Sequence, residues 1–496
     1  MRAHLPATAL FATLAACAPD ADTARGAWLA STLARADQSL ARTRPNLLAS
    51  RYARMASSPF EYYRGALAVF ARDWADGQNS RSHFSSDTHV YALGDPHPEN
   101  FGLMRGGDGA FSLEPNDMDA FDRMPYLWDL RRLLVGVTLG LQDANIGNPA
   151  ARAAAIDAAD TIVRSAVQAY VDTLRALRAD GPPPRVVEPG GNPVLDDMFR
   201  RATRDLAARR ELVDRTTVTD GQRRLRRGVI DPADPGNIVA DLPAWAIATL
   251  PNALDSYRRS LPTAPDASYF RIVDSAREFG SGVASMPRVR VLVLVQGPSE
   301  SIDDDVMLEV RETADSAGAG WQPPGVYVNS IVDRIRHATS VAWARPADTT
   351  VLGDPLWGAV EWLGLACVVR TESDAFKTVR VARWVEERGT PSALAEFAAV
   401  LARLLGRVHA TPLPDDRSPA ARLLAAIDTD AAGFIEEQVC SSRAYAAQTL
   451  ADFDHFRAAL DRRGPTLGVR PESGDMATPS LATLLGSSDP HAPAAP

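Results

Sequence analysis

Residues 94–102 read Gly94-Asp95-Pro96-His97-Pro98-Glu99-Asn100-Phe101-Gly102, and they combine turn-forming residues with polar side chains. The two prolines and two glycines predict a fixed loop, because proline restricts the backbone and glycine allows tight turns. The apolar run 90–93 just before the loop predicts a short strand. We therefore expect the carboxylate of Asp95 and the amide of Asn100 to be held on one ordered loop.

A second acidic loop follows after a short interval. Residues 110–114 predict another strand, which runs into Asn116-Asp117-Met118-Asp119. This alternation of strand and polar loop is typical of a hairpin-like layout, so we expect the two loops to lie close together. Phosphoryl transfer needs an aspartate that accepts a proton and oxygen ligands for Mg²⁺, and the two loops offer both. A solvated acidic hairpin is the alternative interpretation.

The order of these groups resembles that in aminoglycoside phosphotransferases and related small-molecule kinases. Residues 94–100 match their Gly-Asp-x-His-x-x-Asn loop, and residues 116–119 resemble their metal-binding aspartate segment. Trp128-Asp129-Leu130 resembles the Tyr-Asp-Leu that opens their next helix. Three matches in the same order are more specific than one.

This resemblance implies a role for each matched residue. Asp95 would be the catalytic base, and Asn100 and Asp117 would bind Mg²⁺. ATP is the implied nucleotide, although ATP is expected to be scarce in a periplasm. His97 would brace the loop by hydrogen bonding, with a metal-ligand role as the alternative, and Asp129 would hold the loop from the next helix.

Over most of residues 46–460 the chain is similar to the bacterial family called domain of unknown function 2252. The shared residues before the two loops are Arg54-Met55, Ser58-Pro59-Phe60 and Arg64-Gly65. The resemblance implies an α+β, protein-kinase-like fold of two lobes. In this fold a mainly helical large lobe carries the catalytic loops, which precede the small antiparallel sheet lobe as in a circular permutation.

The same resemblance assigns a phosphate-binding side to the sheet lobe. Gly280 and Gly282 would form the turn over the phosphates, for which a simple hairpin turn is the alternative. Arg311 stands where the family has a lysine, and arginine differs from lysine in shape. Lys377 is the only lysine of the chain, and it would contact phosphate together with Arg370. The alternatives are a chance surface lysine and the charged end of a strand.

The rest of the chain divides by composition. Apolar, β-branched runs at 289–295, 306–310 and 365–370 predict an antiparallel sheet, whereas apolar residues at helical spacing predict helices over 60–74, 127–141 and 394–460. The arginine-rich stretches within 181–265 are interpreted as solvated, with an anion-binding patch as the alternative. The expected segments are 1–17 signal peptide, 18–45 linker and helix, 46–180 catalytic-loop half of the large lobe, 181–265 connecting region, 266–385 sheet lobe, 386–463 C-terminal helices and 464–496 disordered tail.

The first residues indicate export. A short apolar run leads into Leu14-Ala15-Ala16-Cys17, which resembles the lipobox of bacterial lipoproteins, so Cys17 would carry the lipid. We expect an envelope lipoprotein that faces the periplasm or lies at the outer membrane and touches the membrane only through this anchor. A plain signal peptide is one alternative, and a cytoplasmic protein is the other. Cys367 and Cys440 remain, and a single bridge between them is left open.

The functional expectation follows from these features. A net charge of -9 argues against nucleic acid as a partner. We expect a kinase-like, Mg²⁺-dependent phosphotransferase, or a degenerate nucleotide- or phosphate-binding relative, that acts on an unknown small molecule. The alternatives are a non-catalytic envelope lipoprotein that binds an anionic ligand or a protein partner, and a metal-assisted phosphoester hydrolase. The oligomeric state is not indicated by the sequence.

Overall fold

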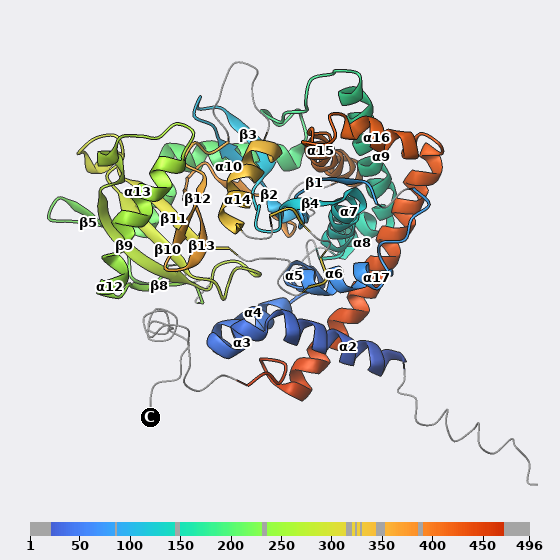
Figure 1. Ribbon diagram of the computed structural model, residues 1–496, viewed down its shortest axis with the longest axis horizontal. Helices are drawn as coiled ribbons and strands as arrows, with labels where there is room; N and C mark the ends of the chain where they lie inside the picture. The colour runs from blue at the N-terminus through green and yellow to red at the C-terminus, as the bar shows by residue number, and fades with distance from the viewer. Residues whose placement is uncertain are drawn as a thin grey trace, which may run out of the picture.

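A large antiparallel sheet and a group of helices stand side by side in the computed structural model (Figure 1). The structure describes residues 21–84, 87–143, 149–230, 236–313, 320–322, 325–327, 330–343, 353–384 and 390–470. The expected lipid-bearing Cys17 and most of the expected C-terminal tail lie outside these ranges. The architecture is α+β, as the sequence predicted.

The helices are α2 (Ala21–Ala36), α3 (Gln38–Thr43), α4 (Pro45–Met55), α5 (Pro59–Gly65), α6 (Leu67–Ala75), α7 (Tyr126–Asp143), α8 (Pro149–Asp157), α9 (Ala159–Arg178), α10 (Pro193–Ala208), α11 (Arg210–Arg215), α12 (Ala244–Ile247), α13 (Leu250–Ser260), α14 (Ile331–Ala342), α15 (Pro391–His409), α16 (Pro419–Ile427) and α17 (Ala431–Arg463). The strands are β1 (His89–Ala92), β2 (Phe101–Arg105), β3 (Phe111–Pro115), β4 (Asp122–Pro125), β5 (Thr216–Thr219), β6 (Gln222–Leu225), β7 (Gly228–Val229), β8 (Ile238–Asp241), β9 (Ile272–Phe279), β10 (Arg290–Val295), β11 (Val306–Glu312), β12 (Gly358–Trp362), β13 (Leu365–Thr371) and β14 (Lys377–Thr378). Short 3-10 turns lie at Pro98–Asn100, Ala267–Phe270 and Ile302–Asp304.

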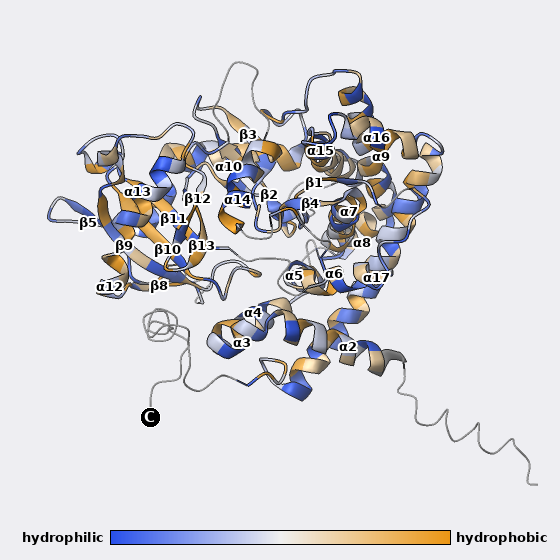
Figure 2. Cartoon of the chain, viewed as in Figure 1, coloured by the Kyte–Doolittle hydropathy of each residue, from blue (hydrophilic) through white to orange (hydrophobic). Residues whose placement is uncertain are grey.

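The large sheet has seven strands in the order β12-β13-β11-β10-β9-β8-β7. Its strands pair antiparallel throughout, and their side chains alternate between two faces. One face packs Val291, Val293 and Leu308 against Leu254 and Tyr257 of α13. Figure 2 shows these strands as mostly hydrophobic, as expected for a sheet that is covered on its faces.

The sheet begins earlier in the chain than predicted. The segment 181–265 was interpreted as a connecting region, yet its strands β7 and β8 extend the edge of the sheet beside β9. These strands are two and four residues long. Strands this short show no recognisable alternation of apolar and polar residues. They are recognised only by their pairing with a neighbouring strand in the folded structure.

The predicted hairpin between residues 90–93 and 110–114 is wrong in its pairing. β1 pairs with β4, whereas β3 pairs with β2, a strand that was not predicted. The segment that forms β2 was not predicted as a strand because it contains Gly102, and glycine is depleted in strands. A Cβ at this position would lie 2.6 Å from the side-chain nitrogen of Asn116, so the glycine allows a close approach.

The helical part is centred on α7, whose residues from Tyr126 to Leu141 are all buried. It packs against α9, α15 and α17. In the described part of the chain, no helix combines the length and apolarity that crossing a membrane requires. Cys367 is buried, Cys440 is exposed, and both thiols are free.

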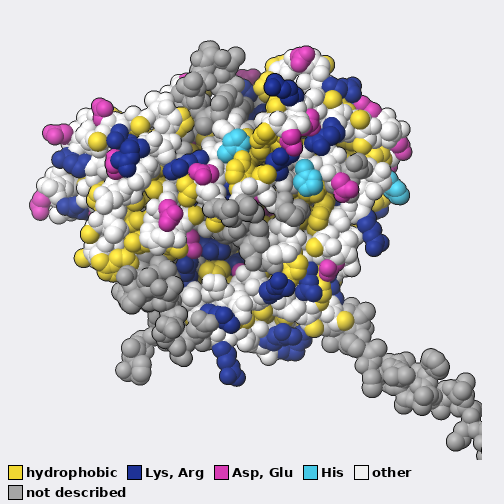
Figure 3. Space-filling model, viewed as in Figure 1, with side chains coloured by type: hydrophobic (Ala, Val, Ile, Leu, Met, Phe, Trp, Pro, Cys, Tyr) yellow, Lys and Arg dark blue, Asp and Glu magenta, His cyan; other side chains and the backbone are white. Residues whose placement is uncertain are grey.

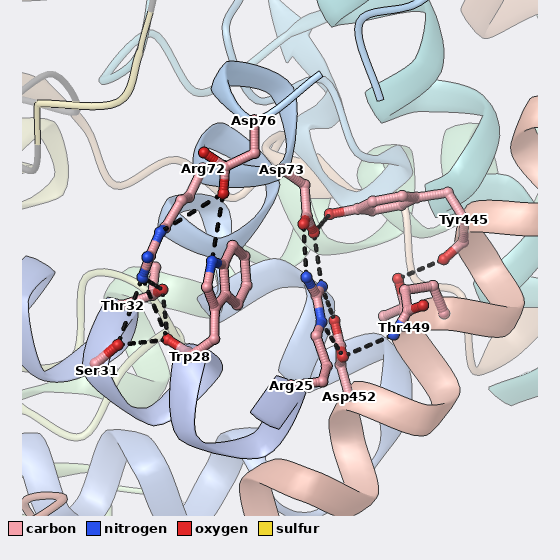
Figure 4. A network of polar contacts seen from close by, with 11 residues as sticks. Arg25, Trp28, Ser31, Thr32, Arg72, Asp73, Asp76, Tyr445, Thr449 and Asp452 are labelled. Carbon is pink, nitrogen blue, oxygen red and sulfur yellow. Dashed lines mark hydrogen bonds and ion pairs between the residues drawn. The ribbon is translucent and has the colours of Figure 1, made fainter. Parts of the chain in front are cut away.

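The N-terminal helix α2 is fastened to the helical part by ion pairs (Figure 4). The guanidinium of Arg25 lies 2.7 Å from Asp73 of α6 and 2.6 Å from Asp452 of α17. Tyr445 donates a hydrogen bond of 2.8 Å to the same Asp73. Helices that are more than 400 residues apart in the sequence are thus held together, and the position of α2 relative to α6 and α17 is fixed.

Candidate functional site

The two acidic loops lie at the same end of the β2–β3 hairpin. Phe101 pairs with Pro115, and the backbone N–H of Asn116 donates a hydrogen bond of 3.0 Å to the backbone oxygen of Asn100. This register places Asn100 and Asp117 side by side where the hairpin ends. The first loop enters from β1 and the second leaves toward β4.

The first loop also packs against the second at Gly94. Its φ of +80° is in the left-handed region, and a Cβ there would lie 2.1 Å from the backbone oxygen of Ala120. Only glycine fits such a close approach without displacing the backbone. Gly94 therefore lets the loop that carries Asp95 approach the loop that carries Asp117.

Asp129 ties the start of the first loop to α7. Its carboxylate accepts hydrogen bonds from the backbone N–H groups of Leu93, at 2.6 Å, and Gly94, at 2.8 Å. His409 of α15 contacts the same carboxylate at 3.3 Å and is itself bonded to the hydroxyl of Tyr170 at 2.8 Å. Since Asp129 and His409 are fully buried, this arrangement positions the loop and cannot contact a ligand.

A cavity of about 220 Å³ lies where the loops meet the sheet. The turn after β9 and the strand β11 close it from the sheet side, and α2, α4 and α5 add a third wall. Six of the residues predicted for the site line it: Asp95, His97, Asn100, Asp117, Gly282 and Arg311. The structure thus brings together residues that are more than 200 positions apart.

Asp95 is paired with a buried arginine. Its carboxylate accepts a hydrogen bond of 2.6 Å from Nε of Arg132, whose side chain is fully buried and stacks on the ring of Tyr63 at 3.7 Å. Burial raises the pKa of Asp95, and Arg132 opposes this rise. The second carboxylate oxygen faces His97 Nε2 at 4.0 Å.

His97 is buried in the loop beneath the cavity, with its ring edge-on to Phe60. Burial lowers the pKa of His97 well below its usual value, and the charges of Arg64 and Arg132 lower it further. The imidazole is therefore neutral at physiological pH. Its Nδ1 is buried without a hydrogen-bond partner among the described residues.

Arg311 reaches from the sheet to the second acidic loop. Its Nη2 lies 3.1 Å from Asp119 Oδ1 and 3.8 Å from Asp117 Oδ1. Burial raises the pKa of Asp119 to about 6, although Arg311 opposes the rise, and the charge of Asp117 adds to it. Arg334 of α14 donates a hydrogen bond of 2.6 Å to the backbone oxygen of Asp119, which fixes the loop. Asp117 is the most exposed of these carboxylates, with 31% of its side chain accessible.

The donor set at the hairpin end suits Mg²⁺. The side-chain nitrogen of Asn100 donates to the backbone oxygen of Asp95 at 2.8 Å, which leaves its amide oxygen for a cation beside Asp117. Across the described ranges, no group of three or more His, Cys, Asp or Glu side chains is arranged to hold a metal ion. Mg²⁺ does not need such a cage, because it is usually bound by one or two protein oxygens together with waters and substrate phosphates.

Three of the predicted phosphate contacts lie away from the cavity. Lys377 pairs with β2 and places its ammonium 3.1 Å from Asp205 of α10. The guanidinium of Arg370 bonds to Glu309 and lies 4.7 Å from the ring of Phe376. Gly280 packs on the backbone of residue 236, to which a Cβ would come within 1.9 Å. Each is engaged in contacts within the protein, so the structure does not bring these three residues together with Asp95 and Asp117 at the cavity.

Sequence reasoning missed several residues of the site. Arg132 follows Asp129 by three positions on α7, and that helical spacing was the available signal. Asp37 and Arg51, which pair at 2.7 Å, line the cavity from the N-terminal helices, and no local pattern pointed to them. Figure 3 shows basic side chains gathered over α3, α4 and α5 on the lower half of this face.

The fold and the site together define a class: an α+β protein in which a helical part and an antiparallel sheet border a cavity that is lined by both carboxylates and arginines. The chain belongs to the family described as "Uncharacterized protein conserved in bacteria (DUF2252)", whose model matches residues 42–459. No curated protein and no solved structure matches the chain.

Proposed function

We propose that this protein is a kinase-like, Mg²⁺-dependent phosphotransferase that acts on a small molecule. The observation that carries the proposal is the meeting of Asp95, Asn100 and Asp117 with Gly282 and Arg311 at one cavity. In kinases an aspartate accepts the proton of the substrate hydroxyl, and an asparagine and a second aspartate hold the metal ions. A glycine-rich turn and a basic residue on a nearby strand face the phosphates.

The sheet supports the same comparison. Gly282 lies in the turn between β9 and β10, and Arg311 lies on β11, the third strand of this meander. Kinases likewise place the glycine-rich loop before a strand that carries the basic residue. Here the strands follow the acidic loops in the sequence, so we propose the permuted kinase-like order for this fold.

The proposed chemistry distributes roles over the chain's own groups. Asp95 would take the proton of the acceptor hydroxyl as its oxygen attacks phosphorus, and Arg132 orients that carboxylate. Asn100 and Asp117 would hold Mg²⁺, which supplies charge neutralisation at the phosphate oxygens. Arg311 would stabilise negative charge from the sheet side.

Titration calorimetry with phosphate compounds, in the presence and absence of Mg²⁺, tests this proposal. We expect saturable binding that requires Mg²⁺ and weakens at least about tenfold in Asp117→Asn. The matched control is Asp108→Asn, which removes the same charge from the exposed tip of the same hairpin. Binding that ignores Mg²⁺, or equal loss in both variants, would contradict the proposed metal site.

A non-catalytic role as an anion-binding envelope protein is the second candidate. It is favoured by the engagement of Asp95 with Arg132, because this hydrogen bond occupies one of the two carboxylate oxygens that could accept the proton of a substrate. A radiolabelled phosphate-transfer assay with a panel of small alcohols and amines separates the candidates, since only the enzyme yields a labelled acceptor. Release of inorganic phosphate without any acceptor would instead favour metal-assisted phosphoester hydrolysis.

We also propose export and lipid anchoring through Cys17, on the basis of the Leu14-Ala15-Ala16-Cys17 sequence. Lipidation of one cysteine adds an anchor without a spanning helix. Membrane fractionation of cells that carry the full chain or Cys17→Ser tests this. The wild-type protein should sediment with membranes and the variant should not, while equal distributions would contradict the anchor.

A further inference from the structure

The size of the cavity restricts what can bind there. Its volume of about 220 Å³ is below the roughly 300–1,000 Å³ of pockets that hold drug-sized ligands. Leu33 and Ala36 of α2 line it on the side away from the sheet. Because Arg25 fastens α2 to α6 and α17 (Figure 4), this wall is fixed. A group that enters this cavity therefore lies between the N-terminal helices and the sheet.

The sheet face next to Arg311 is already occupied by side chains. Residues at alternate positions share a face, so Glu309 and Met307 continue the face that begins at Arg311. Glu309 is fully buried, and it pairs with Arg290 at 2.6 Å and with Arg370. A group attached to phosphates at Arg311 would have to displace this ion-pair cluster to lie along the strands.

The cluster continues across the sheet and is covered from outside. Glu278 of β9, which is 1% accessible at its side chain, accepts a hydrogen bond of 2.9 Å from Arg215 of α11. Beyond it, Met307 packs with Leu212 of α11 and Leu225 of β6. The segment α11–β6 thus closes the face on which a nucleoside could extend from the phosphates.

Cationic side chains line the cavity beside these walls. Arg51 and Arg311 are at least nine-tenths buried, and the Nε of each has no hydrogen-bond partner in the part of the chain that the structure describes. Arg64 and Arg288 line the same cavity, and guanidinium groups are well suited to bind the oxygens of a compact phosphate.

From the fixed walls, the filled sheet face and the arginines that line the cavity, we infer that the site takes a compact phosphate compound without a nucleoside, of which pyrophosphate is the simplest member. The inference rests on the proposed function and names its donor class. In transfer from pyrophosphate, the bond from the acceptor oxygen to phosphorus forms and the bridging oxygen–phosphorus bond breaks. The hydroxyl proton passes to Asp95, and inorganic phosphate leaves with the bonding electrons.

Calorimetric titration of the full chain with pyrophosphate and with ATP, each with excess Mg²⁺, tests the inference. We expect pyrophosphate to bind at least about tenfold more tightly than ATP. ATP binding as tightly as pyrophosphate would overturn the inference and leave the proposed function standing. Failure of both compounds to bind would overturn the proposed function as well.

Two arginine variants test where pyrophosphate binds. Arg311→Gln should weaken pyrophosphate binding at least about tenfold, whereas Arg105→Gln, at an exposed position on β2, should leave it unchanged. Circular dichroism shows whether each variant is folded. If Arg311→Gln does not fold, Arg311→Lys keeps the charge but loses the planar fork, and weakening of at least about threefold is then expected. Unchanged affinity in the folded variant would place pyrophosphate elsewhere.

Discussion

The guanidinium of Arg311 on strand β11 lies 3.1 Å from the carboxylate of Asp119, so the sheet and the second acidic loop are joined by a charged contact at the cavity. Of the three cations that the sequence predicted as phosphate contacts, Arg311 alone reaches the cavity among the described residues, since Arg370 and Lys377 bond elsewhere. This one contact makes the electrostatics of the site depend on both halves of the molecule.

Removal of this cation should make the loop more sensitive to Mg²⁺. Arg311→Gln removes the guanidinium that contacts the carboxylates of both Asp117 and Asp119, and we expect a loss of about 2 kcal/mol in the free energy of unfolding. Added Mg²⁺ should recover part of this loss by replacing the missing charge. Urea unfolding with and without Mg²⁺ measures both effects. An equal Mg²⁺ response in wild type and variant would contradict the prediction.

Gly94→Ala should destabilise the protein by about 3 kcal/mol or more. The left-handed backbone costs a non-glycine residue about 1–2 kcal/mol, and the new Cβ would also clash with the backbone oxygen of Ala120 at 2.1 Å. Gly191 is the matched control, because its φ of +82° is similar and a Cβ added there would meet nothing within 4 Å. Gly191→Ala should therefore lose only about 1–2 kcal/mol. Equal losses in thermal or urea unfolding would mean that the two loops do not touch.

Asp129→Asn should weaken the support of the first loop. The carboxylate accepts two backbone hydrogen bonds and contacts His409, and an amide cannot accept at both of its polar atoms. We expect a loss of about 3 kcal/mol, since a buried donor would be left unpaired. Tyr170→Phe removes only the outer hydrogen bond to His409 and should lose about 1 kcal/mol. The reverse order in denaturant unfolding would contradict this account.

The sequence predicted the structure correctly where residues close together in the chain determine it. Proline and glycine around Asp95 and Asn100 predicted the first loop, and the apolar runs predicted as strands at 289–295 and 306–310 pair in the sheet. The closeness of the two loops was also predictable, although through the wrong strand pair. The β2–β3 hairpin, rather than β1 with β3, aligns Asn100 with Asp117.

Contacts between distant parts of the chain could not be predicted in this way. Nothing near Lys377 in the sequence indicates that Asp205 would pair with it. Arg51 likewise reaches the cavity only because α2 and α4 fold over it. Partner choice among charged side chains is a property of the tertiary structure, and sequence alone gives only the residue types.

The burial of Glu372 near Glu309 and its arginine partners should make the stability of the protein depend on pH. Burial raises the pKa of Glu372 from 4.5 to about 7, the charge of Glu309 adds to the rise, and Arg215 and Arg370 oppose it, while Glu211 contributes a further small rise. A carboxyl whose pKa is raised in the folded state stabilises that state fully below about pH 4.5. This contribution is lost as the pH rises through 7.

Glu372→Gln removes the charge that the folded state disfavours. The variant should match wild type near pH 5 and exceed its free energy of unfolding at pH 8, by on the order of 2 kcal/mol, because each unit of pKa shift corresponds to about 1.4 kcal/mol. Glu361→Gln makes the same substitution at an exposed position on β12 and should show no such trend. Urea unfolding of the three proteins between pH 5 and 8 tests this prediction. If Glu372→Gln instead loses stability relative to wild type as the pH rises, Glu372 is held ionised by its arginines. The ion-pair cluster beside Arg311 would then be more open to water than its burial indicates.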